Sequence, residues 1–382
     1  MGVVSEMKHP NYPELSIYNY THVAQHENIW DDVTEQCRGL IVNNQTDEVL
    51  ARPFRKFFNL NTSFRPETQE ANLPSTTPVV LEKLDGSLGI LYWYNGRPAI
   101  ATRGSFWSDQ AQWATKWYHE RFWQAIHDEP VECGEWPKGY TPLFEIIYKE
   151  NRIVVDYEYE GLVLLGLVSI FDGSELSPEV VSTLGVQNAL RVAKRFDFRT
   201  VGECTSYQAK NAEGFVLQYW PKGNSAPLRI KIKTEEYIRL HKIITGMNAK
   251  GIWEHLMLGY DSDAIWTNTT PQFTDWALGY IRMFNKMYKE LETNALLTFG
   301  KIYTRVLEER SIVERANGQR MDERALQKSY ALAIQEESSQ YHPILFAILK
   351  GTGYKTQIWK QLEPKIIEKE VYIRDADQFN GI

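Results

Sequence analysis

The pattern of hydrophobic and polar positions changes character near residue 235. Before that point, apolar residues come in short runs that turn residues such as Asn95-Gly96 separate, and several runs alternate with polar residues. Alternation with a period of two is typical of half-buried β-strands, and Asn-Gly favours a tight hairpin turn. The pattern predicts strands over 79–81, 88–94, 98–102, 141–147, 162–170, 212–219 and 228–234.

From Glu235 onward, the apolar residues follow a helical spacing instead. Helices are predicted over 235–257, 271–309, 322–337, 343–350 and 355–370, in addition to earlier helices over 108–127 and 180–195. A chain of 382 residues is long enough for two domains. We therefore expect an α+β protein, with a mixed N-terminal domain over residues 1–243 and an all-α C-terminal domain over 244–382.

One stretch places a lysine where it can act as a nucleophile. The apolar run that begins at Val79 ends on Lys83, just before the turn signal Asp85-Gly86. Residues two apart on an extended chain share a face, so Lys83 and Asp85 are expected to project into one site. Lysine attacks only when it is neutral, and we expect nearby cations to depress its pKa. A plain hairpin with a surface lysine is the alternative.

Other charged residues stand at the ends of the predicted strands. Each also has a simpler interpretation: a surface ion pair for Arg38, a solvent-facing carboxylate for Glu145, and solvated edge-strand side chains for Lys231 and Lys233. Between Arg52 and Asn59, three cations mix with three aromatics, which suits either nucleotide binding or an edge strand. The residues selected together are Arg38, Lys56, Phe58, Lys83, Asp85, Arg103, Glu145, Glu213, Lys231 and Lys233.

This combination of residues suits phosphoryl-group chemistry. Cations can hold a triphosphate, carboxylates can hold Mg²⁺, and a lysine can attack the α-phosphorus. A net charge of −7 argues against non-specific wrapping of a polyanion but leaves room for a local basic groove. The three cysteines lack CxxC grouping, the first residues do not show the charged-then-apolar pattern of a leader, and the longest apolar stretch, 161–171, is too short to cross a bilayer. We expect a cytoplasmic protein without a membrane partner.

The motifs resemble those of the covalent nucleotidyltransferases, the superfamily that contains DNA ligases, RNA ligases and mRNA capping enzymes. Over about residues 15–240, the chain is more closely similar to the ATP-dependent, tRNA-repairing RNA ligases of T-even bacteriophages. The first resemblance rests on Lys83-Leu-Asp-Gly86, Phe144-Glu145, Glu213-Gly214 and Lys231-Ile-Lys233, and the second on Cys37-Arg38-Gly39, Arg52-Pro53, Lys56-Phe-Phe-Asn-Leu60, Asp85-Gly-Ser-Leu88 and Asn151-Arg-Ile-Val154. Arg103 departs from the phage ligases, which have lysine there; the charge is retained, but a planar fork replaces a point cation.

The resemblance implies a fold, an activity and roles for the residues. It implies ATP-grasp-like antiparallel sheets with flanking helices, and an RNA ligase that joins 5′-phosphate and 3′-hydroxyl ends through lysyl-AMP and RNA-adenylate. Its cofactors would be ATP and Mg²⁺, with Mn²⁺ as a substitute. Lys83 and Asp85 would be catalytic; Arg38, Lys56, Phe58, Lys83, Arg103, Glu145, Lys231 and Lys233 would bind the nucleotide; Glu145, Glu213, Asp261 and Asp263 would bind metal.

By the same resemblance, the substrate would be a broken RNA such as a nicked tRNA. An end-healing kinase or phosphatase would prepare its ends, in the cytoplasm or, for a phage-encoded protein, the host cytoplasm. Alternatives are a ligase that requires a 2′-phosphate end and a non-catalytic RNA-binding relative. A DNA ligase or a capping enzyme is disfavoured, because both usually append a small β-barrel where this chain has a helical tail.

Overall fold

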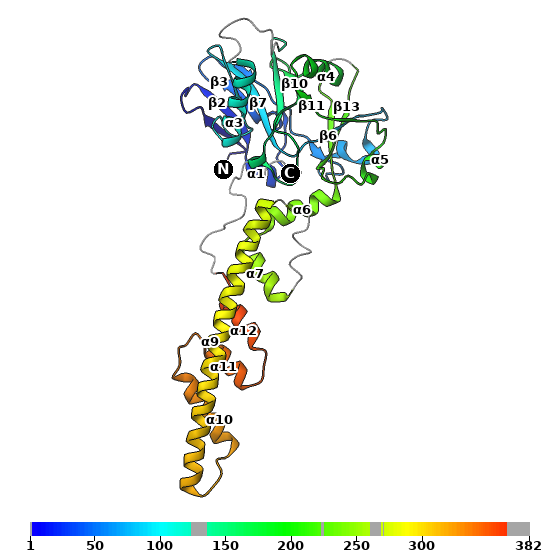
Figure 1. Ribbon diagram of the computed structural model, residues 1–382. Helices are drawn as coiled ribbons and strands as arrows, with labels where there is room; N and C mark the ends of the chain where they lie inside the picture. The colour runs from blue at the N-terminus through cyan, green and yellow to red at the C-terminus, as the bar shows by residue number, and fades with distance from the viewer. Residues whose placement is uncertain (1, 124–135, 223–224, 260–268, 270, 365–382) are drawn as a thin grey trace. The chain divides into compact units, whose positions relative to one another are not determined.

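The computed structural model describes residues 2–123, 136–222, 225–259, 269 and 271–364 (Figure 1). The described chain separates into two compact units, one reaching to His241 and the other beginning at Lys242. The division lies two residues before the expected boundary, inside helix α6 (Glu235–Gly246). The α+β class is confirmed, because antiparallel sheets and helices make up the first unit and helices follow them.

Strands of the first unit form three sheets in the described residues. Their orders are β1-β2-β3-β4, β11-β10-β9-β7-β8 and β12-β6-β13-β14-β5. Pairing is antiparallel except between β10 and β11 and between β14 and β5. The strands are β1 (Val4–Lys8), β2 (Leu15–Tyr20), β3 (Arg38–Asn43), β4 (Glu48–Ala51), β5 (Phe58–Asn59), β6 (Val79–Lys83), β7 (Ser87–Tyr94), β8 (Arg97–Ala101), β9 (Tyr140–Ile147), β10 (Gly161–Ser169), β11 (Arg191–Val192), β12 (Arg195–Phe196), β13 (Gly214–Tyr219) and β14 (Leu228–Lys233).

Alternation along these strands separates the core from the site. On β13, Phe215 and Leu217 enter a core with Val201 of helix α5, whereas Val216 and Gln218 face a cleft. Two larger cores lie on opposite faces of the sheet that contains β9, because Phe144 belongs to one and Leu143 to the other, and a smaller cluster contains Ile147. The remaining helices of this unit are α1 (His22–His26), α2 (Asp32–Gln36), α3 (Asp109–Tyr118), α4 (Pro178–Gln187) and α5 (Val201–Ser206).

Three predicted helices in or next to this unit differ from the observed ones. The helix expected over 180–195 ends at Gln187, because Ala189 takes a positive φ of 50° and the chain returns as β11 and β12. The helix expected over 108–127 is α-helical over Asp109–Tyr118 and continues as a π-helical turn over His119–Trp123, and residues 124–127 lie outside the described residues. The helix expected over 235–257 is broken, because the Asn248 side chain caps a new helix, α7 (Ala249–Leu258), and accepts a bond from Gly251 N at 2.9 Å.

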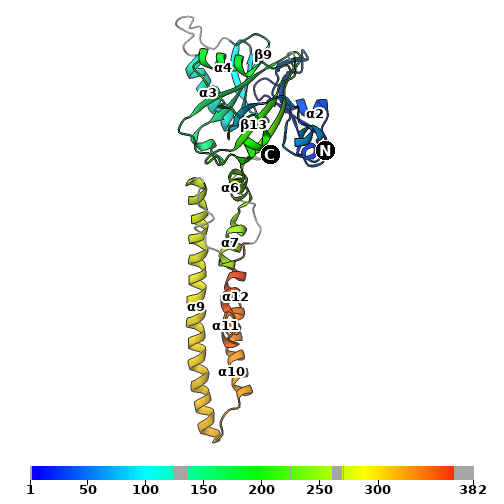
Figure 2. The ribbon, with the colours of Figure 1, turned by 90° about the vertical axis from the view of Figure 1, so that its right-hand side faces the viewer.

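The second unit is built on one long helix, α9 (Pro271–Asn317), against which the neighbouring helices pack (Figures 1 and 2). Ile302 and Val306 of α9 share a core with Ile334 and Leu345. Helix α9 continues past the expected end at residue 309, and the last described helix ends at Gln361, with residues after 364 outside the described chain. The neighbours of α9 are α7, α10 (Glu323–Gln335), α11 (His342–Leu349) and α12 (Tyr354–Gln361).

No helix in the described ranges combines the length and the apolarity that crossing a membrane requires.

Candidate active site

The registers of three neighbouring strands bring two lysines to the same level of one sheet. Gly214 at the start of β13 pairs with Lys83 at the end of β6 and with Lys233 at the end of β14. Gly214 has φ +151°, and a Cβ there would lie 2.0 Å from the carbonyl oxygen of Ile232. Only glycine therefore permits this approach of β13 to β14, which places Glu213 between the lysines.

Glu213 makes ion pairs with both lysines. Lys83 Nζ lies 2.6 Å from Glu213 Oε2, and Lys233 Nζ lies 3.4 Å from Glu213 Oε1. The Glu213 side chain is 4% exposed, and those of Lys83 and Lys233 are 18% and 11% exposed. The alternatives of a surface hairpin lysine at Lys83 and a solvated edge strand at Lys233 are therefore wrong, and β14 lies inside its sheet.

The electrostatic environment of Lys83 differs from the expected one. Burial alone would lower its pKa, but Glu213, Glu145 and Asp85 together raise it above the ordinary value for lysine. The expectation that surrounding cations depress this pKa is wrong for the free protein, because the attraction of three carboxylates outweighs the effect of burial. Lys83 therefore stays protonated while Glu213 remains paired with it, and its pKa falls if that ion pair is broken.

The depressed pKa belongs to Lys231 instead. Burial, followed by repulsion from Lys56, Lys83, Arg38 and Lys233, lowers the pKa of Lys231 well below its ordinary value. Lys231 is 6% exposed, and its Nζ lies 5.3 Å from the centre of the Phe57 ring. This concentration of positive charge favours an anionic ligand, because an anion would relieve the repulsion.

Glu145 faces the same cleft from the second sheet. Its Oε1 accepts a hydrogen bond from Gly86 N at 2.9 Å, so the Asp85-Gly86 turn is tied to β9. Burial raises the pKa of Glu145 to about 8, with Lys83 opposing and Glu213 and Asp85 reinforcing the shift. A carboxyl that titrates near neutrality can serve as a hydrogen-bond donor or as an anionic ligand.

Asp85 is 4% exposed and occupied by structural hydrogen bonds. Its Oδ2 accepts from Val154 N and Val155 N, each at 2.9 Å, and its Oδ1 accepts from Tyr237 Oη at 2.8 Å. These contacts join the turn after Lys83 to the 154–155 segment and to α6. In this geometry Asp85 fixes the position of the lysine's turn, and its carboxylate does not line the cleft.

A second group of cations surrounds a residue that the sequence did not mark, Tyr20. The Tyr20 hydroxyl accepts a hydrogen bond from Arg103 Nη1 at 2.8 Å and lies 3.4 Å from Lys56 Nζ. Burial would raise the pKa of Tyr20, but Arg103, Lys56 and Arg38 outweigh burial and lower it. Arg38 Nη1 is buried and has no hydrogen-bond partner among the described residues, so the surface ion-pair interpretation of Arg38 is wrong.

Lys56 lies among aromatic rings rather than in solvent. Its Nζ is 5.0 Å, 5.1 Å and 5.6 Å from the ring centres of Tyr20, Trp30 and Phe58. Burial lowers the pKa of Lys56, against the opposing effect of Tyr20. Phe58 is itself 8% exposed on the edge strand β5. The edge-strand alternative is right for Phe58 but wrong for Lys56, which is buried rather than solvated. Nucleotide binding by these residues stays a prediction.

One cleft collects many of these side chains from all three sheets. Its lining includes Arg38 of β3, Lys83 of β6, Leu88 of β7, Glu145 of β9 and Lys231 of β14. Of the residues selected from the sequence, five line this cleft: Arg38, Lys83, Arg103, Glu145 and Lys231. The other five that the structure describes do not line it: Lys56, Phe58, Asp85, Glu213 and Lys233.

The expected metal ligands are only partly described. Asp261 and Asp263 lie outside the described residues. Within the described part of the chain, no three His, Cys, Asp or Glu side chains are grouped as a metal site. Magnesium in nucleotide enzymes often takes one or two carboxylates and completes its shell with phosphate oxygens and water. Glu145 and Glu213 fit that smaller requirement, because Glu213 pairs with Lys83 at 2.6 Å and Glu145 lines the same cleft as Lys83.

Sequence reasoning missed Tyr20, Trp30 and Tyr237. Tyr20 and Trp30 lie among polar neighbours in a stretch whose pattern indicates only short strands and loops without defined bounds, so their contacts with Lys56 had no signal in the pattern. Tyr237 follows Lys233 by four residues, in the first turn of α6, and its ring centre lies 5.1 Å from Lys233 Nζ; no motif in the sequence signals this contact between a strand and the next helix.

Comparison with known proteins agrees with this arrangement. A family model described as RNA ligase matches residues 36–237, more than half of the chain, and the chain therefore belongs to the RNA ligase family. The chain is 28% identical to a Thermovibrio ammonificans protein with a provisional RNA ligase name, over 72% of this chain and 71% of that protein. It is 25% identical to an RNA ligase of Rhodothermus phage RM378, over 88% of this chain and 86% of the relative.

The family resemblance noted from the motifs is thereby confirmed. Among solved structures, one of an RNA ligase from Naegleria gruberi aligns with 44% of this chain and 52% of the ligase chain, at 15% identity and a TM-score of 0.33. That likeness is too weak to support an argument about this chain.

Proposed function

We propose that the protein is an ATP-dependent RNA ligase that uses Lys83 as its nucleophile. The observation that carries the proposal is the position of Lys83. It lies in a cleft between carboxylates and a group of buried cations, of which Arg38 has an unpartnered donor. A buried donor without a partner indicates a ligand acceptor, and the surrounding positive charge selects an anion such as a triphosphate.

In the first step, Lys83 Nζ attacks the α-phosphorus of ATP. A nitrogen–phosphorus bond forms, the bond from the α-phosphorus to the bridging oxygen breaks, pyrophosphate leaves, and the lysine gives up a proton. Arg38, Lys56 and Lys231 hold the phosphates. A divalent cation bound by Glu145 and Glu213, Mg²⁺ or Mn²⁺, would neutralise the charge of carboxylates and phosphates. Lys233 keeps Glu213 paired when Lys83 becomes neutral.

Two further transfers complete the reaction. An oxygen of the RNA 5′-phosphate attacks the same phosphorus, the nitrogen–phosphorus bond breaks, and Lys83 recovers a proton as RNA-adenylate forms. The RNA 3′-hydroxyl then attacks the 5′-phosphorus, and AMP leaves with the bonding electron pair. We assign the physiological role to repair of broken RNA such as nicked tRNA, after an end-healing kinase or phosphatase has prepared the ends in the cytoplasm.

Incubation with α-labelled ATP and a divalent cation tests the proposal. The wild type should acquire a covalent AMP on the peptide that contains Lys83, and Lys83→Ala should acquire none. Absence of label from the folded wild type would overturn the proposal and favour a non-catalytic RNA-binding relative. Sealing assays on RNA with 5′-phosphate and 3′-hydroxyl ends, on RNA with an added 2′-phosphate, and on nicked DNA then separate the ligase alternatives.

A further inference from the structure

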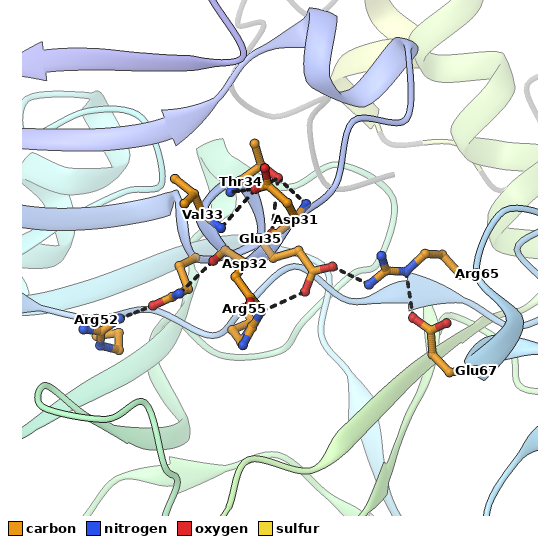
Figure 3. Close-up of polar contacts among 10 residues, drawn as sticks. Asp31, Asp32, Val33, Thr34, Glu35, Arg52, Arg55, Arg65 and Glu67 are labelled. Atoms are coloured by element: carbon orange, nitrogen blue, oxygen red, sulfur yellow. Dashed lines mark hydrogen bonds and ion pairs between the residues drawn. The ribbon is translucent and has the colours of Figure 1, made fainter.

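Helix α2 lies directly before β3, the strand that begins at Arg38. Figure 3 shows its polar contacts with arginines of the segment from 52 to 65, which also contains Lys56. Its residue Glu35 accepts hydrogen bonds through both carboxylate oxygens: from Arg65 Nη2 at Oε1 and from Arg55 Nη2 at Oε2, the latter at 3.3 Å. Gln36 accepts a further bond from Arg52 Nη1. Three arginines on the segment from 52 to 65 are therefore anchored to α2 and to the acidic residues around it.

The helix that carries Glu35 is fixed at its own start. Asp31 Oδ1 accepts from Val33 N at 3.0 Å and from Thr34 N at 2.8 Å, and Thr34 Oγ1 accepts from Asp31 N at 2.8 Å. This reciprocal capping satisfies the free amides of a short helix. The Glu35 side chain is 12% exposed, so its two ion pairs are largely shielded from water.

Glu35 holds Lys56 by two routes. Its backbone carbonyl accepts from Lys56 N at 2.8 Å. Its carboxylate holds Arg65, whose guanidinium carbon lies 4.4 Å from the centre of the Phe58 ring, and Phe58 is one of the three rings around Lys56 Nζ. Glu35 therefore fixes the main chain of Lys56 directly, and it fixes the Phe58 side of the surrounding aromatic rings through Arg65.

We infer that Glu35 is a positioning residue that sets Lys56 for the β- and γ-phosphates of ATP. The inference rests on the proposed function. An alternative role for Arg55 and Arg65, as free contacts for RNA phosphates, is less compatible with the structure because Asp32, Glu35 and Glu67 already pair with them. A displaced Lys56 would weaken binding of the terminal phosphates and leave the AMP portion untouched.

Nucleotide binding to the full-length chain tests this inference. Calorimetry in a Lys83→Ala background, which prevents turnover, gives dissociation constants for ATP and for AMP. Glu35→Gln keeps the volume and the backbone contact but removes the charge that holds two arginines. We expect ATP affinity to fall about tenfold, because small displacements of positioned groups have large effects, and AMP affinity to change less than about twofold.

A double-mutant cycle shows whether Glu35 acts through Lys56. Lys56→Met should itself weaken ATP binding, and adding Glu35→Gln to it should cause little further loss, because the route is already removed. Asp32→Asn is the matched control. Asp32 is 90% exposed and pairs with Arg55, so removing its charge should change ATP affinity less than about twofold.

Several outcomes would overturn the inference: unchanged ATP affinity in Glu35→Gln, equal losses for ATP and AMP, or full additivity with Lys56→Met. If Glu35→Gln does not fold, Arg65→Gln removes the same ion pair from the other side and should give the same selective loss. A wild type that forms no lysyl-AMP refutes the proposed function. A labelled wild type with normal ATP binding in Glu35→Gln refutes only this inference.

Discussion

Lys83 Nζ lies 2.6 Å from Glu213 Oε2, although 130 positions separate these residues in the sequence. The pair explains why the nucleophile candidate is protonated in the free protein: Glu213 is the strongest of the carboxylates that raise its pKa against the effect of burial. A buried ion pair of this kind stores the nucleophile in an inactive form, because only neutral lysine can attack phosphorus.

Glu213→Gln should move the pH dependence of lysyl-AMP formation. The substitution removes the largest influence that raises the pKa of Lys83, so the neutral lysine becomes populated at lower pH. Rates at subsaturating ATP should rise with pH in both proteins, but the rise should begin at lower pH in the variant, even as its overall rate falls. Identical pH midpoints in the two proteins would mean that Glu213 does not control protonation of Lys83.

Glu145 should make the protein less stable as pH rises through the neutral range. Its pKa in the folded protein is about 8 against an ordinary 4.5, so between these values the folded state binds a proton that the unfolded state has lost. The free energy of unfolding therefore falls with rising pH, by at most about 1.4 kcal/mol per pH unit. Glu145→Gln should remove this slope, and denaturant unfolding at several pH values measures it.

Glu203→Gln provides a control of opposite sign. Hydrogen bonds from the backbone N–H groups of Arg199 and Thr200 lower the pKa of Glu203, so its carboxylate stabilises the fold above its ordinary pKa. This variant should lose stability relative to the wild type as pH rises from acid to neutral, whereas Glu145→Gln should gain. The assignment for Glu145 would be contradicted if, relative to the wild type, the free energies of unfolding of both variants changed with pH in the same direction.

The sequence predicted which residues share a strand face at the site, but it did not predict the pKa shifts of those residues. Strand periodicity placed Arg229, Lys231 and Lys233 on one face, and the structure confirms that they share the face towards the cleft and Glu213. The direction of the pKa shift at Lys83 was wrong, because it depends on which distant carboxylate the sheet register brings beside it.

The pattern of hydrophobic and polar positions also did not predict the helix boundaries or the residues around Lys56. The break after Gly246 depends on a side-chain cap by Asn248, and the helical spacing of apolar residues continues across it. Tyr20 and Glu35 contact Lys56 through sequence separations that no local motif records. Periodicity reports burial along one element, whereas a site assembled from several sheets depends on contacts between elements.

Gly214→Ala should destabilise the protein and abolish adduct formation together. A methyl group there would lie 2.0 Å from the Ile232 carbonyl oxygen, and alanine rarely adopts φ +151°. Strain and overpacking together should cost about 3 kcal/mol or more. Gly96→Ala is the matched control, because Gly96 also has a positive φ but open space around its Cβ position. It should cost about 1 kcal/mol and leave adduct formation intact.

Deleting residues 246–382 should separate nucleotide chemistry from substrate choice. The cleft is lined entirely by residues before His241, and Tyr237, which bonds Asp85, remains in the shortened chain. Lysyl-AMP formation should therefore persist. Sealing of a nicked tRNA should fall much more than sealing of a linear RNA, if the helical unit selects structured RNA. Both activities are measured with the same preparation, after a melting curve has established that the shortened chain is folded. Equal losses on the two RNAs would assign the helical unit a general role in sealing rather than one in substrate selection.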